Sequence, residues 1–328
     1  MKSTIAALAL VVGVGPVSSV AATKTNSGYA YYEIGDTHSA RPAPTERALL
    51  LNGGGDWNLN AFRWFAAKAG HGHLVVIAAY GGAEDGEEFY RNIGGFASVQ
   101  TLVFSERKAS FDPRVIRILK DADAIFIAGG DQSKYVRFWK GTPVARAIDQ
   151  EIASGRPVGG TSAGLAILGA TGYGAMDGGS IDSPTALADP LGPAVTMVRG
   201  FLHMPFLQHI VTDTHYAARN RLGRHIAFLA QVRVRWDPKA IGLAVDQDSA
   251  LCVDANGVGR FFTSNTGEAW LIQPSGMPRA IKGKPLDWPA VRITRFGPEA
   301  TIDLKTMRID GPRKSIVASV NRGRLKGV

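Results

Sequence analysis

A serine between two glycines is the first feature of this sequence that could do chemistry. Residues 158–169 read VGGTSAGLAILG, and Ser162 stands at the centre of a G-x-S-x-G pattern within them. An apolar run precedes the pattern and a run with helical spacing follows it, which is the context that holds a nucleophilic serine on a sharp turn. Small neighbours avoid clashes where such a turn is strained. We interpret Ser162 as a nucleophile, with a helix-capping serine as the alternative.

The same turn would supply a hydrogen-bond donor to a substrate. Ala163 directly follows the serine and opens the predicted helix. Backbone N–H groups at this position face the oxygen of an attacked carbonyl, where negative charge develops. We therefore expect Ala163 to contribute to an oxyanion hole.

A serine nucleophile needs a base, and the sequence contains seven histidines. His215 lies after an apolar strand-like run and before a helical pattern, where a side chain can reach the edge of a sheet. We interpret His215 as the general base. His225 lies among apolar residues, so we expect it to be packed in the core. The others are interpreted as structural or solvated: His38, His71, His73, His203 and His209.

Strand and helix patterns alternate up to the serine. Five apolar runs, each followed by a helical pattern, are typical of a parallel sheet that is covered on both faces. From residue 240 onward the runs are shorter and separated by turns, which indicates antiparallel strands. We predict a three-layer α/β fold, with a mostly parallel sheet, helices on both faces and an antiparallel-rich C-terminal portion. The predicted parallel strands lie in Arg47–Gly55, His73–Gly82, Val99–Glu106, Asp123–Asp131 and Arg156–Gly164.

The first residues have the pattern of a secretory signal peptide. Lys2 precedes an apolar run, Ile5–Val14, that is too short to span a bilayer, and small residues allow cleavage after Ala22. The predicted location is therefore outside the cytoplasm, in the periplasm or the surrounding medium. The predicted parts of the chain are a signal peptide at 1–22, a flexible polar leader at 23–46 and a single α/β domain at 47–328.

Charge and cysteine content exclude several classes of function. The formal net charge is +9, and the basic residues gather without interleaved aromatic residues, so we expect no nucleic-acid partner and favour anionic substrates. The single cysteine, Cys252, excludes an intrachain disulfide and lies in an apolar run, which indicates an inert thiol. No H-E-x-x-H or C-x-x-C spacing occurs. We expect no metal, no cofactor and no membrane span after signal cleavage.

Four segments, in this order along the chain, resemble the cyanophycinase branch of the peptidase S51 family, which is related to the aspartyl dipeptidases. The histidine–arginine segment is the most discriminating, because simpler aspartyl dipeptidases lack its full R-x-R-x-x-R pattern. The resemblance extends from Leu49 to Leu304 and rests on FIAGGDQ (Phe126–Gln132), GGTSAGLAILG (Gly159–Gly169), DTHYAARNRLGR (Asp213–Arg224) and IGLAVDQDSAL (Ile241–Leu251).

The resemblance implies a serine exopeptidase on a glutamine-amidotransferase-like α/β fold, so that residues 47–328 would be a peptidase domain. Ser162 would be the nucleophile and His215 the base, with Gly130 and Ala163 as oxyanion donors. The substrate would be cyanophycin, a poly-aspartate with arginine on each β-carboxyl, or a related β-aspartyl peptide, and cleavage would release β-Asp-Arg. The residues expected to line the substrate pocket are Gln132, Asp213, Thr214, Arg219, Arg221 and Arg224.

The pocket residues suit such a substrate chemically. Three arginines within six positions can bind a free aspartyl carboxylate through bidentate hydrogen bonds. The guanidinium half of the substrate calls for carboxylate or amide oxygens, which Asp213 and Gln132 could supply. The alternative for the arginine cluster is a solvated helix face with carboxylate partners.

Two positions depart from the family pattern. Thr214 stands where the family usually has a glutamine before the histidine, which would alter recognition of the substrate side chain. Gln247 stands, between Asp246 and Asp248, where the family carries the acid that orients the histidine. An amide oxygen can hold the imidazole but cannot stabilise an imidazolium ion by charge. We assign Gln247 to this position and keep Asp248 as the alternative third member.

The leading hypothesis is an exported serine exopeptidase acting on β-aspartyl-linked substrates. Because Gln247 replaces an acid, a non-catalytic or altered-specificity binding protein on the same fold stays open, as does an aspartyl dipeptidase. An esterase on an α/β-hydrolase fold is disfavoured, because the sequence has no H-G-G-G-type oxyanion motif. A homodimer is left open.

Overall fold

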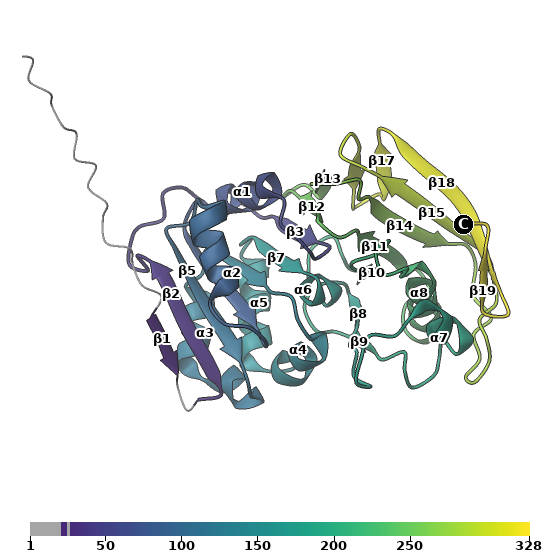
Figure 1. The fold of residues 1–328 in the computed structure, drawn as a ribbon, viewed down its shortest axis with the longest axis horizontal. Helices are drawn as coiled ribbons and strands as arrows, with labels where there is room; N and C mark the ends of the chain where they lie inside the picture. Colours follow the sequence, from purple (N-terminus) through teal and green to yellow (C-terminus); the bar gives the residue numbers. More distant parts are fainter. Residues whose placement is uncertain (1–20, 25–26) are drawn as a thin grey trace, which may run out of the picture.

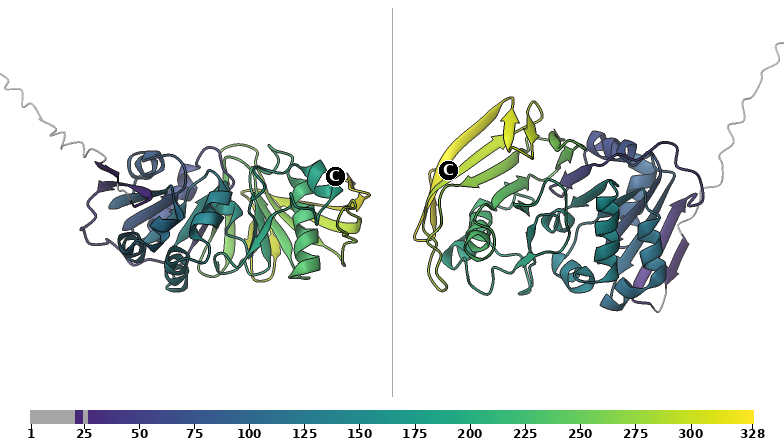
Figure 2. Two further views of the ribbon diagram at one scale, coloured as in Figure 1. Left: turned by 90° about the horizontal axis from the view of Figure 1, so that it is seen from below. Right: turned by 180° about the vertical axis from the view of Figure 1, so that it is seen from behind.

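The structure, a computed structural model, describes residues 21–24 and 27–328, which form two β-sheets with helices packed against them (Figure 1). The N-terminal half of the chain builds most of one sheet, and the C-terminal half builds the other (Figure 2). The predicted signal peptide lies outside the described residues, apart from its last two positions. In the described ranges, no helix is long and apolar enough to cross a bilayer.

The first sheet is parallel at its centre. In the described residues it has eleven strands, in the spatial order β1 (Ala21–Lys24), β2 (Tyr29–Gly35), β5 (Ser98–Phe104), β4 (His73–Ala78), β6 (Ala124–Ile127), β7 (Val158–Thr161), β3 (Leu49–Asn52), β12 (Ser249–Val253), β13 (Val258–Thr263), β16 (Thr301–Asp303) and β17 (Arg308–Asp310). The strands from β5 to β3 are parallel and coincide with the apolar runs expected from the sequence. Antiparallel strands extend the sheet at both ends, with β2 beside β5 and β12 beside β3.

Both faces of this sheet are covered, because alternate residues of its strands enter two separate cores. Leu74 and Val76 of β4 pack into one core with Phe62, whereas Val75 and Ile77 enter the other. The first face carries α1 (Leu59–Lys68), α2 (Glu84–Glu87) and the π-helical turn η1 (Glu88–Ile93). The second face carries the 3-10 turn η2 (Arg107–Phe111), α3 (Pro113–Lys120), α4 (Gln132–Trp139), α5 (Pro143–Ala153) and α6 (Ala163–Ala166).

Local sequence signals set the starts of these helices. Asp112 accepts a hydrogen bond from the N–H of Arg114 at 2.8 Å, and Pro113 occupies the first turn of α3. Thr142 caps α5 in the same way, again with a proline next in the chain. A side-chain oxygen satisfies an N–H that has no partner within the helix, and proline lacks that N–H. These local signals explain why the two helices begin where they do.

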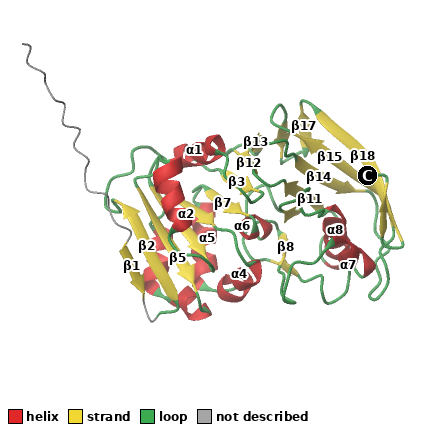
Figure 3. Cartoon of the chain, viewed as in Figure 1, coloured by secondary structure: helices red, strands yellow, loops and turns green. Residues whose placement is uncertain are grey.

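The second sheet is mixed. Its eight strands in the described residues are, in spatial order, β19 (Arg324–Lys326), β18 (Arg313–Asn321), β15 (Trp288–Phe296), β14 (Ala269–Pro274), β11 (Ile241–Val245), β10 (Ile210–Asp213), β8 (Thr171–Tyr173) and β9 (Met197–Arg199). β10 runs parallel to β8 and β11, and the other pairs are antiparallel. Helices α7 (Ser183–Ala188) and α8 (Leu222–Arg235) pack against one face (Figure 3). The predicted α/β class with an antiparallel-rich C-terminal portion is confirmed.

The segment predicted as a flexible leader is not loose throughout. Within residues 23–46, β2 pairs with β5 over its whole length, and Tyr29, Tyr31 and Ile34 are buried. Tyr29 and Tyr31 alternate as in a half-buried strand, but Ile34 breaks the period of two, so the sequence pattern is weak. The ordered sheet thus begins well before the boundary that the sequence suggested.

Candidate active site

The candidate site lies where strands of both sheets end. Ser162 directly follows β7, His215 follows β10 by one residue, and Gln247 lies in the turn after β11. The N–H of His215 donates to the carbonyl of Gly53, which follows β3, at 2.8 Å. Parallel strands place their carboxyl ends at one edge, so the fold gathers segments that are far apart in sequence.

The turn at Ser162 is strained and closely packed. Ser162 has φ 51° and ψ −115°, a conformation that side-chain-bearing residues rarely adopt. A Cβ atom on Gly164 would lie 2.1 Å from the carbonyl oxygen of Ile127, and one on Gly160 would lie 2.8 Å from the backbone of Gly164. Both glycines of the motif are therefore required by close backbone approach. Strain of this kind costs about 1–3 kcal/mol and is typical of functional sites.

His215 lies in hydrogen-bond contact with the serine. The distance between Ser162 Oγ and His215 Nε2 is 2.8 Å. The imidazole packs on the backbone of Gly54, where a Cβ atom would lie 2.3 Å from the ring. His215 itself has φ 44°, and its side chain is buried. A serine and an imidazole in this arrangement can exchange a proton.

Gln247 contacts the second nitrogen of the His215 imidazole. Its Oε1 lies 3.0 Å from His215 Nδ1. Because an amide oxygen only accepts, Nδ1 carries the ring proton and Nε2 is left to receive the serine proton. Burial lowers the pKa of His215, the hydrogen bond to Gln247 opposes this shift, and the guanidinium groups of Arg219 and Arg221 add to it. The imidazole is thus held neutral, in the form that acts as a base.

Asp248, the alternative third member, does not face the imidazole. Its carboxylate accepts from the N–H of Asp56 at 2.7 Å and from the side chain of Asn265 at 3.1 Å. The other neighbour, Asp246, accepts from the backbone of Ala217 at 2.9 Å and from the indole of Trp270 at 3.0 Å. Both carboxylates organise loops, so the residue that contacts His215 here is an amide.

The two residues expected to form an oxyanion hole flank the serine. Ala163 is the first residue of α6, and Gly130 lines the same cavity as Ser162. Gly130 has φ 130°, which favours glycine, and a Cβ atom on neighbouring Gly129 would lie 3.6 Å from that of Ser162. The loop after β6 therefore runs alongside the serine.

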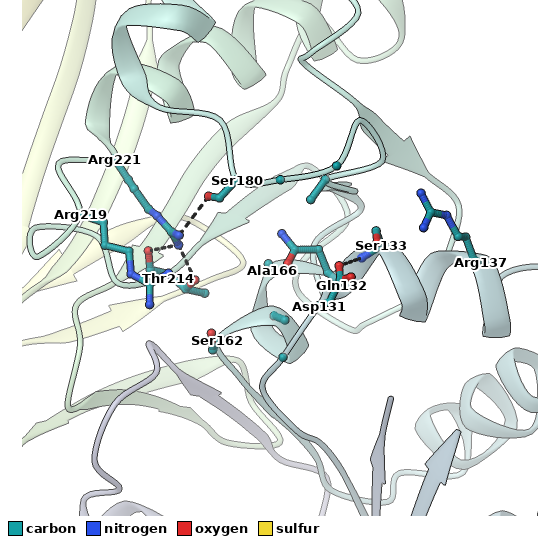
Figure 4. Close-up of a pocket in the computed structure, with 15 residues that line it drawn as sticks. Asp131, Gln132, Ser133, Arg137, Ser162, Ala166, Ser180, Thr214, Arg219 and Arg221 are labelled. Atoms are coloured by element: carbon teal, nitrogen blue, oxygen red, sulfur yellow. Dashed lines mark hydrogen bonds between the residues drawn. The ribbon is translucent and has the colours of Figure 1, made fainter. Parts of the chain in front are cut away.

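A cavity of ≈ 330 Å³ opens on one side of Ser162 and is rich in arginine; we call it the basic cavity (Figure 4). Arg219 and Arg221 lie at one end, Arg137 of α4 lies at the other, and Gln132 lies between them (Figure 4). The Arg219 guanidinium makes no hydrogen bond or ion pair with the described residues. The further lining residues are Gly130, Asp131, Ser133, Ala163, Ala166, Ala175, Gly178, Gly179, Ser180 and Thr214.

Two of the predicted pocket residues lie behind the cavity wall instead. Asp213 and Arg224 are each 1% exposed, and Arg224 Nε donates to Asp213 Oδ2 at 2.8 Å. Burial alone would raise the pKa of the Asp213 carboxyl, but Arg224 outweighs burial and holds this pKa below its usual value. The prediction that both line the pocket is wrong, because a charge buried this deeply needs a partner within the protein.

Arg221 lines the basic cavity and is also held by hydrogen bonds within the protein. Its Nη1 donates to the carbonyl of Thr214 at 2.9 Å and to the Thr214 hydroxyl at 3.0 Å, while the residue also lines the basic cavity. Burial lowers the pKa of Arg221 to about 10. Thr214, where the family has a glutamine, thus acts partly by fixing this arginine.

A second, wider cavity of ≈ 870 Å³ also borders Ser162 and shares Gly130 and Arg219 with the basic cavity; we call it the acidic cavity. Glu84 and Asp85 of α2 line it, and burial, followed by the charges of Glu84 and Glu88, raises the pKa of Asp85. In the part of the chain that the structure describes, no group of three His, Cys, Asp or Glu side chains could hold a metal ion. The other lining residues are Gly55, Trp57, Tyr80, Gly81, Gly82, Gly129, Gly130, Thr161, His215 and Arg219.

Sequence reasoning missed several residues in and around this site. Arg137, Glu84 and Asp85 belong to surface helices with ordinary charge patterns, so no local signal marks them. Asn52 is fully buried at the end of β3, and its Oδ1 accepts from the N–H of Gly54 at 2.9 Å and the hydroxyl of Thr161 at 2.6 Å. A polar residue that ends an apolar strand was the signal that could have identified Asn52.

Comparison with known families bears directly on this geometry. The family model for peptidase family S51 matches residues 83–258, which include the serine turn, His215 and Gln247. The chain belongs to peptidase family S51. It is therefore a hydrolase of the peptidase class, and the resemblance found in the sequence is confirmed.

The named relatives of this chain share about a quarter of its residues over the aligned regions. The chain is 27% identical over 226 residues to a cyanophycinase of Trichormus variabilis, covering 66% of this chain and 70% of the relative. It is 26% identical over 188 residues to a cyanophycinase of Synechococcus elongatus, covering 57% of this chain and 52% of the relative. The structure of a peptidase from an acI-B1 Actinobacterium superposes with a TM-score of 0.51 at 16% identity, covering 79% of this chain and 97% of the other. This last likeness shows the fold.

Proposed function

We propose that this S51 peptidase is a serine-type exopeptidase that hydrolyses β-aspartyl-linked substrates, and that cyanophycin is its polymer substrate. The observation that carries the proposal is the 2.8 Å contact between Ser162 Oγ and His215 Nε2 on a strained turn. Beside it lies a cavity with a guanidinium that has no partner among the described residues. The names of the cyanophycinase relatives support the choice of substrate.

The proposed reaction has two steps. Ser162 Oγ attacks the aspartyl carbonyl carbon while its proton passes to His215 Nε2, and the N–H groups of Gly130 and Ala163 bind the developing oxyanion. The C–N bond then breaks, and His215 gives the proton to the departing amine. Water then attacks the resulting ester while His215 Nε2 takes a proton from it. The ester bond breaks, the aspartyl carboxylate is released, and His215 returns the proton to Ser162 Oγ.

The basic cavity would hold the aspartyl half of the substrate. Arg219 has no partner among the described residues, and Arg221 and Arg137 border the same space. Guanidinium groups bind carboxylates through paired, charge-assisted hydrogen bonds. This arrangement supports a substrate with a free carboxylate in its acyl half, which in cyanophycin is the α-carboxylate of the arginine joined to the aspartyl side chain.

The test is incubation with cyanophycin, β-Asp-Arg and α-aspartyl peptides, with products identified by mass. Ser162→Ala should lower kcat by about 10³-fold or more, because the nucleophile is lost. Unchanged thermal unfolding of the variant would show that its fold is intact. Full activity in the folded variant would overturn the proposed mechanism.

The second candidate is a binding protein that has lost catalysis, and it rests on the amide of Gln247 at the position of an acid. Labelling with a fluorophosphonate separates the two candidates, because only an activated serine reacts. A covalent adduct on Ser162 supports the peptidase, and no adduct on folded protein supports the binding protein.

We also propose that the protein works outside the cytoplasm. The support is the N-terminal pattern of a charged residue, an apolar run and small residues up to Ala22. N-terminal sequencing of the protein recovered from the periplasm or medium should find Thr23 first. Recovery from the cytoplasm with Met1 in place would contradict this.

A further inference from the structure

The acidic cavity contains the imidazole that would give a proton to a leaving group. His215 lines this cavity and does not line the basic cavity. A general acid must reach the leaving-group nitrogen to which it gives a proton. In the proposed reaction, the chain beyond the scissile bond would therefore enter the acidic cavity, and the acyl half would enter the basic cavity.

The carboxylates of this cavity are available to a ligand. Glu84 accepts one hydrogen bond, from the N–H of Gly82 at 2.7 Å, and its second oxygen is left over. Asp85 makes no side-chain hydrogen bond or ion pair with the described residues. Asp213, the acid first expected to receive a guanidinium, is neutralised by Arg224 and cannot do so. A cationic group near Ser162 would meet Glu84 and Asp85 instead.

The aromatic walls of the cavity favour a flat cation. Trp57 lines the cavity and is held by stacking on Phe62, with ring centroids 4.5 Å apart. Tyr80 also lines it and is 74% exposed, which is unusual for a large aromatic side chain. Guanidinium groups stack on aromatic faces while their edges donate to carboxylates.

We propose that the acidic cavity is a leaving-group subsite that selects a guanidinium-bearing unit beyond the scissile bond. The two cavities then give the site opposite charges on its two sides, with Ser162 between them. Arg219 lines both cavities, so it stands where the carboxylate-binding side begins. The inference rests on the proposed function, since it assigns the two sides of that reaction.

The test compares two substrates that differ only in charge. Each is a dimer of β-aspartyl-arginine units, and in the second substrate citrulline replaces arginine in the departing unit, which removes the charge at nearly constant shape. We expect the wild type to have a kcat/KM about tenfold higher for the arginine dimer. Asp85→Asn and Glu84→Gln together should bring this ratio close to one. Glu87→Gln, a matched change on the same helix but outside the cavity, should leave the ratio unchanged.

A binding measurement separates failure of the subsite from failure of the proposed function. Ser162→Ala protein is titrated calorimetrically with β-aspartyl-arginine and β-aspartyl-citrulline. Preference for the arginine compound that disappears with Asp85→Asn and Glu84→Gln supports the subsite, whether or not the wild type hydrolyses the dimers. Equal binding of the two compounds, or equal turnover of the two dimers by an active wild type, would overturn it.

Discussion

An amide, and not a carboxylate, faces Nδ1 of the His215 imidazole. Gln247 fixes the ring by accepting from Nδ1 at 3.0 Å. It supplies no negative charge, however, when Nε2 takes the serine proton and the ring becomes positive. Burial and two nearby guanidinium groups already disfavour that positive form. The proposed base is therefore well placed but weakly supported by charge.

Replacing the amide with an acid should strengthen this base. Gln247→Glu should raise kcat by about tenfold or more, since the missing charge in a triad can be worth several orders of magnitude. The pKa of His215 is lowered in the wild type, so its neutral form persists to below the usual pKa of about 6.5. A carboxylate at 247 would raise this pKa, and the acidic limb of the pH–kcat profile should move to higher pH.

Asp248→Asn provides the control for this change. It alters a carboxylate next in the chain that does not face the imidazole. The position of the acidic limb should stay as in the wild type. If Gln247→Glu left both kcat and the limb unchanged, contact between residue 247 and the base would have no part in catalysis.

At the scale of elements, the segment that runs from β10 into α8 uses some of its arginines to hold the fold and exposes another to the cavities. Arg224 lies in the first turn of α8 and turns inward to Asp213 at the end of β10. Arg221 lies just before that helix and ties it to Thr214, whereas Arg219 is exposed towards the cavities. The buried pair thus anchors the helix to the strand and holds the loop that carries His215.

Breaking this pair should destabilise the fold. Asp213→Asn leaves Arg224 as an uncompensated buried charge, which should lower the free energy of unfolding by about 3–5 kcal/mol. Urea unfolding followed by circular dichroism measures the change. The double variant Asp213→Asn with Arg224→Met should recover much of the loss, because it removes the unpaired charge. A single variant as stable as the wild type would show that the ion pair does not anchor the segment.

At the scale of the whole molecule, the two sheets share one large core. Leu49 and Leu51 of the first sheet belong to the same cluster of buried residues as Leu243 and Val245 of the second. The serine comes from the first sheet and the histidine from the second. The distance between Ser162 and His215 therefore depends on how the two sheets pack.

The N-terminal strand β2 is part of this assembly. A chain that starts at Ser27 keeps β2, and its midpoint of thermal unfolding should stay close to that of the full chain. A chain that starts at Thr37 loses the burial of Tyr29, Tyr31 and Ile34, each worth about 1.5–3 kcal/mol, and exposes β5 as an edge. We expect a clearly lower midpoint and aggregation. Equal midpoints for the two chains would contradict a structural role for β2.

The sequence alone determined the parallel strands, the serine turn and the identity of His215. These features depend on local order: apolar runs form strands, glycines permit a tight turn, and motif residues follow strand ends. The tertiary structure decided that Arg224 neutralises Asp213 and that Gln247, not Asp248, meets the imidazole. It also brought Arg137 and Asp85 into two cavities that border Ser162. Side-chain direction and charge pairing depend on contacts between distant segments, and no spacing within one segment encodes them.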